Sequence, residues 1–331
     1  MNQLSIYTLK ALRKLYAKSF GTPYLSPVSQ EKDPNKASDM IYALLESDKP
    51  CMIARFGATE LTCIKNFLSI KTGDKNILKY IKGETFDWWW NPNIMAQMQN
   101  WSGFFPPTED NLERFCELML EDAKEVDLCG VFPSVDVMIK KILPFMDEPI
   151  FVPLHTFSPF IVQSNPWSKV LEGKKVLVIH PFAELIEKQY EKRLLLFKNP
   201  QILPDFKLKV IKAVQSIGGE SNGFTDWFQA LNYMKRQMDE TDYDICLIGC
   251  GAYGFPLAAY AKRMGKKAVH IGGGLQLLFG IKGKRWETPT AAIQWGLPSD
   301  FYKILFDNSA WVRPDEYRTI NSEKVENACY W

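Results

Sequence analysis

Short apolar runs alternate with amphipathic helical patterns along most of this chain, and this alternation restricts the fold more than any other feature of the sequence. The apolar runs lie at 51–56, 127–132, 149–154, 175–180, 208–214, 244–249 and 267–272. The helical patterns lie at 38–47, 109–123, 134–143, 157–171, 183–197, 223–238 and 255–265. Strands that are apolar on both sides, separated by helices, are typical of a mostly parallel sheet covered on both faces. The sequence therefore predicts an α/β protein with a doubly wound, mostly parallel, Rossmann-like sheet.

The pattern divides the chain into three parts. Residues 1–37 are expected to form an N-terminal amphipathic helix and a linker, and residues 38–290 a Rossmann-like catalytic domain. An aromatic segment at about 71–108 interrupts that domain, and residues 291–331 form a C-terminal extension. The N-terminal helix, at 4–20, combines leucines with lysines and arginine, so it either packs on the domain or makes reversible contact with an anionic membrane surface.

Composition excludes several classes of protein. The net charge of +2 argues against a dedicated nucleic-acid binder. No apolar run reaches the roughly 18 residues that cross a bilayer, and the N-terminus lacks a secretory signal. The seven cysteines contain no C-x-x-C pair, which favours reduced thiols in a cytoplasmic protein.

Aromatic residues are unusually frequent, at 13% with ten tryptophans, three of them consecutive at Trp88–Trp90. This abundance is compatible with a well-filled core and an aromatic loop. The alternative is a platform for sugar rings or a surface that dips into a membrane.

Ligands of a doubly wound sheet bind outside the carboxyl ends of its strands, so the residues that follow each strand are the candidates for function. All three histidines, His155, His180 and His270, lie at or next to such ends. A single histidine at a strand end is more often a hydrogen-bonded structural residue, so each needs a second observation to be assigned a role.

A glycine pattern follows the run at 244–249. Gly249, Gly251 and Gly254 fit G-x-G-x-x-G between a predicted strand and a predicted helix, where glycines let the backbone approach a phosphate. A dinucleotide site also needs an acidic residue about 20 positions on, and the sequence there is KKAVHIGGG. The pattern therefore favours a different phosphate-bearing ligand, and a tight turn without a ligand is the alternative.

The next segment, HIGGGLQLLFGIKGKRW, adds consecutive glycines and clustered cations, which suit a diphosphate. The alternative for the K-G-K-R cluster is a solvated surface turn. The predicted ligand-binding residues are Gly57, Gly249, Gly251, Tyr253, Gly254, His270, Gly272, Gly273, Gly274, Gln276, Lys282, Lys284 and Arg285.

Two blocks, IARFGATELTCI at 53–64 and the segment at 218–286 that contains GCGAYG and HIGGGLQLLFGIKGKRW, resemble bacterial glycosyltransferases of the GT-D fold. The resemblance implies a Rossmann-like transferase with a UDP-sugar donor. It implies a saccharide, lipid-linked saccharide or glycoprotein acceptor in surface polysaccharide or glycoprotein assembly. The cysteines favour a cytoplasmic location, which would be at the inner face of the membrane if the N-terminal helix contacts lipid.

The family pattern is R-F-G-D-x-E, whose two carboxylates are tied to a divalent metal and the donor diphosphate. Here Ala58 replaces the aspartate, Thr59 follows, and only Glu60 remains. One carboxylate is a poor site for Mn²⁺ or Mg²⁺, which need several oxygen ligands. Arg55 and the K-G-K-R cations are the alternative means of stabilising the leaving UDP.

Transfer also needs a base for the acceptor hydroxyl. Glu60 is the first candidate, although it could equally be a carboxylate that stabilises a helix start. The next candidates for the base, in order, are Glu184, Asp226 and His180. Glu220 and Ser221 are candidates for contacts with sugar hydroxyls, or Ser221 or Asn222 caps a helix. Two other functions stay open: a non-catalytic nucleotide- or sugar-binding protein, and a phospho- or pyruvyltransferase of polysaccharide assembly.

Overall fold

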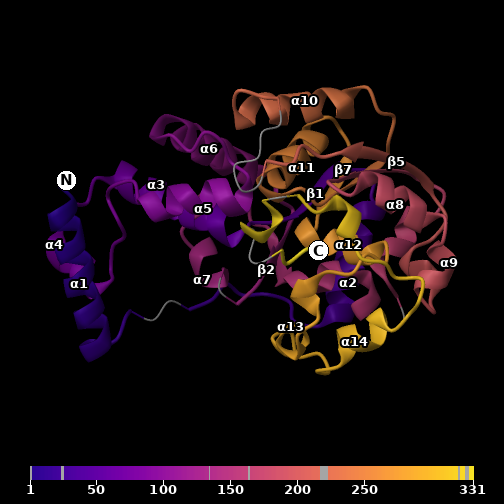
Figure 1. The fold of residues 1–331 in the computed structure, drawn as a ribbon, viewed down its shortest axis with the longest axis horizontal. Helices are drawn as coiled ribbons and strands as arrows, with labels where there is room; N and C mark the ends of the chain where they lie inside the picture. Colours follow the sequence, from indigo (N-terminus) through magenta and orange to yellow (C-terminus); the bar gives the residue numbers. More distant parts are fainter. Residues whose placement is uncertain are drawn as a thin grey trace.

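The computed structural model describes residues 2–23, 26–133, 135–162, 165–216, 223–319, 321–324 and 328–331. Its strands are β1 (Cys51–Arg55), β2 (Leu128–Val131), β3 (Ile150–Pro153), β4 (Lys175–His180), β5 (Lys207–Lys212), β6 (Ile245–Ile248) and β7 (Lys267–His270). They form one parallel sheet in the order β3-β2-β1-β7-β6-β4-β5 (Figure 1). The predicted doubly wound α/β fold is confirmed.

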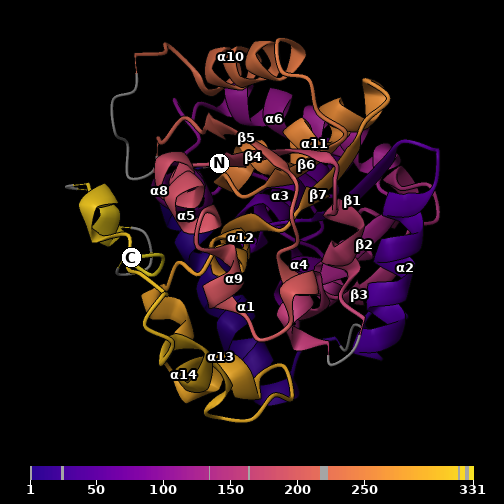
Figure 2. The ribbon, with the colours of Figure 1, turned by 90° about the vertical axis from the view of Figure 1, so that its right-hand side faces the viewer.

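Helices cover both faces of the sheet. The larger helices are α2 (Pro34–Glu46), α3 (Ala58–Thr72), α6 (Glu109–Asp122), α8 (Ala183–Tyr190), α10 (Trp227–Asp239) and α11 (Gly254–Arg263). The shorter ones include α7 (Asp136–Ile139), α9 (Arg193–Leu196), α12 (Leu275–Leu278), α13 (Pro289–Ile293) and α14 (Phe301–Phe306). One core cluster joins the sheet to α3, α6, α10 and α11, and the other joins it to α2, α8 and α12. In Figure 2, α6, α10 and α11 lie together along the top of the sheet.

Alternate residues of each strand enter the two core clusters. In β1, Met52 and Ala54 face one cluster, whereas Cys51 and Ile53 face the other. This period of two follows from the pleat of a strand, and both faces are apolar because helices exclude water from both. All seven cysteines, each within the described ranges, are buried thiols without a disulfide, as the sequence predicts.

The winding of the chain opens crevices at the carboxyl edge of the sheet. The chain leaves β4 through α8 on one face and leaves β6 through α11 on the other. Likewise, α3 follows β1 on one face, and α12 follows β7 on the opposite face. Ligands of doubly wound folds bind at such reversals, so the pairs β4/β6 and β7/β1 position the site.

One predicted helix is absent. The segment expected to be helical at 157–171 contains three short 3₁₀ turns instead, ending with Trp167–Leu171. Pro159 and Pro166 lie in this stretch, and each lacks the N–H that a continuous α-helix requires.

The aromatic insertion forms α4 (Ile77–Lys82) and α5 (Pro92–Ser102). Trp88 and Trp89 pack around Tyr80 with ring centroids 5.2 and 5.4 Å away, and Trp90 lies 6.5 Å from Phe67. The three tryptophans are therefore partly buried against Tyr80 and Phe67, which favours packing within the protein over a sugar platform.

The N-terminal helix α1 (Gln3–Phe20) packs on α4 rather than on the sheet, and the pair forms a lobe at one end of the molecule (Figure 1). No helix in the described part of the chain is both long and apolar enough to cross a bilayer.

The C-terminal residues return to the sheet. The backbone N–H of Lys284 donates to Trp331 at 3.1 Å, and that of Arg285 donates to Cys329 at 2.9 Å. Trp311 and Trp331 are buried in the same core cluster as α2 and α8. The last residues thus contribute to the carboxyl edge of the sheet, where the predicted site lies.

Candidate active site

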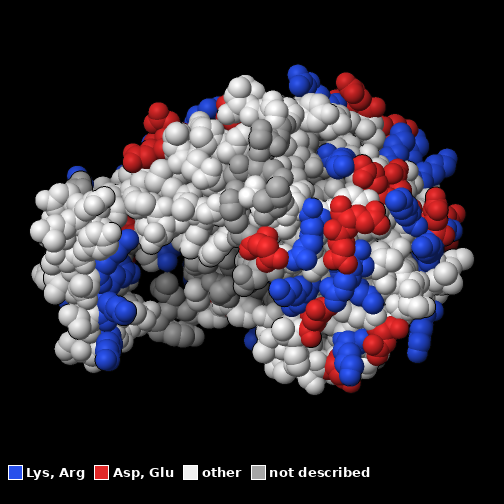
Figure 3. All heavy atoms as spheres, in the orientation of Figure 1, with Lys and Arg blue, Asp and Glu red and all other residues white. Residues whose placement is uncertain are grey.

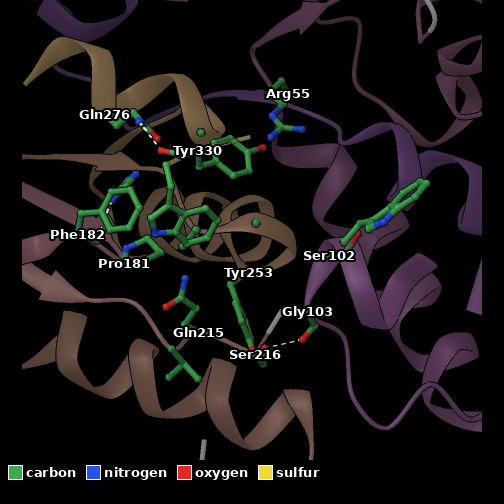
Figure 4. Close-up of a pocket in the computed structure, with 18 residues that line it drawn as sticks. Arg55, Ser102, Gly103, Pro181, Phe182, Gln215, Ser216, Tyr253, Gln276 and Tyr330 are labelled. Atoms are coloured by element: carbon green, nitrogen blue, oxygen red, sulfur yellow. Dashed lines mark hydrogen bonds between the residues drawn. The ribbon is translucent and has the colours of Figure 1, made fainter. Parts of the chain in front are cut away.

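Two adjoining cavities open at the carboxyl edge of the sheet. The smaller, of about 90 Å³, lies outside β4 and β6 (Figure 4), and the larger, of about 570 Å³, lies outside β1. Small-molecule sites usually have about 300–1,000 Å³. The lining residues that both cavities share are Arg55, Trp101, Ser102, Gly251, Gly273 and Tyr330.

Arg55 is the cation at the junction of the cavities. It is the last residue of β1, and its Nε is buried without a hydrogen-bond partner among the described residues. Gly272, at φ 76°, lies against the guanidinium, and a Cβ there would overlap it. Figure 4 shows the guanidinium directed toward Tyr330. A partly buried guanidinium with an unpaired donor is suited to bind an anionic ligand that enters the cavities.

The glycines of the G-x-G-x-x-G pattern divide into two roles. Gly249 and Gly251 line the smaller cavity, and Gly251 has φ 59°. A Cβ at Gly249 would come within 2.7 Å of the carbonyl oxygen of Gly272, so the two glycine loops are in close contact. Gly254 lines neither cavity and lies against the ring of His270. The first two glycines of the pattern therefore border the smaller cavity, and the third allows α11 to pack against His270.

Gly254→Ala is expected to lower the free energy of unfolding by about 2 kcal/mol, because the new methyl group would overlap the buried His270 ring. Gly254 has φ −63°, so backbone strain is not involved. Gly274, with φ −62°, is the matched control, because its nearest neighbour would be Ile271 at 3.6 Å. Urea unfolding measures both variants. Equal stabilities would contradict the packing role of Gly254.

Glu60 lines the larger cavity and is buried, with 8% of its surface exposed. It occupies the third position of α3, and its carboxyl group folds back over Gly57, where a side chain would overlap it. Glutamate at this position commonly reaches back to the helix start. The carboxylate thus lies at a helix N-terminus, which favours its negative charge, and also faces the cavity.

The three histidines have different surroundings. Burial lowers the pKa of His180 to about 3, and its Nδ1 accepts the backbone N–H of Phe182 at 3.0 Å. The proton of the neutral ring is therefore assigned to Nε2, and no lone pair is free to act as a base. Burial, with Arg55 nearby, lowers the pKa of His270 to about 3, and this ring supports the loops without lining a cavity.

His155 differs because it lines the larger cavity. Burial lowers the pKa of its imidazole to about 4, and its ring lies 4.8 Å from that of Trp295. Its Nδ1 is buried without a hydrogen-bond partner among the described residues. His155 was not among the predicted catalytic residues, although it lies at a strand end, and the structure brings it to the same cavity as Glu60.

Two predicted bases lie elsewhere. Glu184 is exposed and pairs with Lys212 at 2.9 Å, which lowers the pKa of the carboxyl group. Asp226 caps α10 by accepting the backbone N–H of Gln229 at 2.8 Å. Neither residue lines the two cavities, so the carboxylate candidates at the site reduce to Glu60. Glu220, Ser221 and Asn222 lie outside the described residues.

Two of the other predicted ligand-binding residues hold the loops in place through hydrogen bonds. Gln276 is buried, and its Nε2 donates to the carbonyls of Lys282 at 2.8 Å and Tyr330 at 3.0 Å. Burial raises the pKa of the Tyr253 phenol, whose oxygen lies 3.0 Å from Ser216 Oγ. Both also line the smaller cavity. Lys282 and Lys284 do not line the cavities, whereas Arg285 lines the larger one.

Arg285 lies over an aromatic ring of the C-terminus. Its guanidinium is 4.7 Å from the centroid of Tyr330, and its Nη1 is 3.2 Å from the Tyr330 hydroxyl. The meeting of distant aromatic residues at the larger cavity was not predicted. Its members come from α5, the segment around α13 and the C-terminus, and they are Trp101, Trp286, Trp295 and Tyr330. No local pattern marks them, because they are far apart in the sequence.

A divalent metal fits this site poorly. Glu60 is the only carboxylate among the described residues that line the two cavities. Across the described part of the chain, no three His, Cys, Asp or Glu side chains are grouped as a metal site. Mn²⁺ and Mg²⁺ need several oxygen ligands, so these side chains do not form one.

The fold and the cavities define an α/β protein with two adjoining cavities at the switch points of a parallel sheet. Residues 32–278 match the family described as GT-D fold-like domain, so the chain belongs to this family, which has a glycosyltransferase-type fold. No curated protein matches the sequence. A solved structure, a selenomethionine-substituted domain of unknown function 1792, aligns over 80% of this chain and 82% of its own, with 13% identity and a TM-score of 0.40.

Proposed function

We propose that this protein is a glycosyltransferase that moves a sugar from a UDP-sugar to a saccharide acceptor. The observation that carries the proposal is the junction of the two cavities. There Arg55 and the glycine loops lie beside a cavity of about 570 Å³ that contains the carboxylate of Glu60. The acceptor is a saccharide, lipid-linked saccharide or glycoprotein of bacterial surface assembly, and the reaction takes place in the cytoplasm.

In this proposal the donor diphosphate binds beside Arg55, Gly251 and Gly273. Arg55 and backbone N–H groups would stabilise the negative charge that develops on the leaving diphosphate. At Gly251 the close approach of phosphate oxygens is sterically allowed, because this residue carries no side chain and the nearest atom in that direction is the carbonyl oxygen of Ser102 at 3.5 Å, whereas at Gly273 the ring of Tyr330 occupies the corresponding space. The sugar then extends into the larger cavity, where Trp101 and Trp295 offer apolar faces.

Transfer requires one proton movement. The acceptor hydroxyl gives its proton to the Glu60 carboxylate as its oxygen bonds to the anomeric carbon, while the bond from that carbon to the diphosphate oxygen breaks. UDP leaves with the electron pair. His155, whose Nδ1 has no hydrogen-bond partner among the described residues, is the second candidate base of this cavity, but its lowered pKa makes it a weaker base than an ordinary histidine.

In this proposal, arginine side chains supply the positive charge that stabilises the leaving diphosphate. Arg55 and Arg285 line the larger cavity, and the family's first carboxylate position is Ala58. We therefore propose that transfer proceeds without Mn²⁺ or Mg²⁺.

A panel of nucleotide sugars tests the function. We expect a UDP-sugar to raise Tm and to release UDP when incubated with the protein and a saccharide acceptor, at the same rate with Mn²⁺ or with EDTA. Thermal shift and a UDP-release assay measure the two effects. Binding without release would indicate a non-catalytic protein, and a product mass with added phosphate or pyruvyl would indicate a different transferase. Dependence on Mn²⁺ would contradict the metal-free mechanism alone.

A further inference from the structure

Helix α1 leaves most of its apolar side chains in solvent. All its residues are described, and Leu9 is the only one of them that is buried. Leu4 is 77% exposed and Leu15 63%, and Leu12 is also exposed. At 3.6 residues per turn these three positions fall within about 80° of one another around the axis, so they lie on one side of α1. An isolated exposed leucine is ordinary on a protein surface, but three on one helical face form a strip.

Helix α4, which packs on α1, adds further exposed apolar side chains to the lobe. Ile77 and Leu78 of α4 are exposed at 53% and 69%. The packing between α1 and α4 therefore uses other side chains. Arg13 lies 4.7 Å from the centroid of the Tyr80 ring and donates to the carbonyl of Thr85 at 2.8 Å. The exposed strip is thus a feature of a helix that is fixed to the protein at its opposite side.

The charges of α1 are all positive. The helix contains Lys10, Arg13, Lys14 and Lys18 and no acidic residue. Lys10 lies 3.8 Å from Asp87, whereas Lys14 and Lys18 have no ion pair within the described part of the protein. Figure 3 shows a row of basic side chains along one side of this lobe, beside a broad face without charged side chains.

We propose that α1 binds the surface of an anionic membrane, with the leucine strip in the headgroup region and Lys14 and Lys18 on anionic lipid. An apolar face beside lysines is the arrangement of helices that lie in the plane of a bilayer interface. A second copy of the chain is a worse match, because it would bring an equally basic, acid-free helix against α1. Lysines close to the surface of an anionic membrane are attracted to it electrostatically. This inference does not depend on the proposed enzymatic function.

Sedimentation of the full chain with lipid vesicles tests the proposal. We expect binding to phosphatidylcholine vesicles that contain phosphatidylglycerol, and at least about tenfold weaker binding to phosphatidylcholine alone. The double variant Leu4→Ser/Leu15→Ser should bind the anionic vesicles at least about tenfold more weakly than the wild type does. Lys14→Gln/Lys18→Gln should lose most of the preference for anionic lipid.

The matched control is Leu194→Ser/Leu195→Ser. These leucines of α9 are 67% and 64% exposed and lie at the other end of the molecule, so their replacement should leave binding unchanged (Figure 1). The proposal is overturned if the wild type shows no preference for anionic vesicles, or if the α1 leucine variant binds as the wild type does. A dimer in analytical ultracentrifugation that Leu4→Ser/Leu15→Ser dissociates, without vesicle binding, would overturn it in favour of a second copy.

Discussion

Replacing Glu60 by glutamine is expected to lower kcat of sugar transfer by about 100-fold or more, with little change in KM for the donor. Glutamine has the same shape but cannot accept the proton of the acceptor hydroxyl. It keeps the hydrogen-bonding groups that suit the start of α3, so the free energy of unfolding should change by less than about 1 kcal/mol. Steady-state kinetics of UDP release and urea unfolding measure the two quantities.

Glu184→Gln is the matched control for this substitution. Glu184 is also a glutamate in the first turn of a helix, but it pairs with Lys212 and lines neither cavity. Its replacement should leave kcat unchanged. If Glu60→Gln retains near-normal kcat, Glu60 is only a helix-start carboxylate, and His155→Gln becomes the variant to test for the base.

Replacing Arg55 by alanine is expected to reduce kcat/KM by about 1,000-fold, and Arg55→Lys should recover only part of that loss. Loss of one positioned donor to a developing oxyanion typically costs 10²–10³-fold, and Arg55 contributes a full charge as well. Lysine keeps the charge but not the planar fork of donors, so it cannot reproduce a two-oxygen contact with a diphosphate. Kinetics and UDP affinity by calorimetry measure the effect.

Arg193 supplies the control for Arg55. It is likewise partly buried with an unpartnered Nε, but it pairs with Asp205 at 2.8 Å and lines neither cavity. Arg193→Lys should therefore leave kcat/KM and UDP affinity unchanged. Unchanged UDP affinity in Arg55→Ala would mean that the diphosphate binds elsewhere.

The local apolar pattern was sufficient to predict the strands of the sheet. Each apolar run is a strand within two residues of its predicted bounds. A strand buried on both faces is apolar along nearly its whole length, so its ends are easy to predict from the sequence. The helical prediction at 157–171 was wrong because Pro159 and Pro166 outweighed the apolar periodicity. The strand order and the places where its winding reverses required the tertiary structure.

Strand ends also predicted several of the residues that line the two cavities. Arg55, Glu60, Gly251 and Gly273 meet at the cavities because the carboxyl ends of parallel strands lie along one edge. The same rule misplaced Glu184, whose position after β4 is close to the site in sequence but whose side chain turns to Lys212 in solvent. A strand end fixes where a backbone segment lies, and the direction of each side chain depends on the helix that follows.

The sequence by itself determined that this chain forms a parallel sheet between helices, with glycines and Arg55 at its carboxyl edge. These features follow from the apolar pattern and from short-range steric rules, which act between residues close in the chain. Only the tertiary structure decided that His180 has no free lone pair, that Gly254 packs under His270, and that Trp295 and Tyr330 face Glu60's cavity. Those outcomes depend on contacts between residues far apart in the chain, and no local pattern specifies which distant side chains will meet.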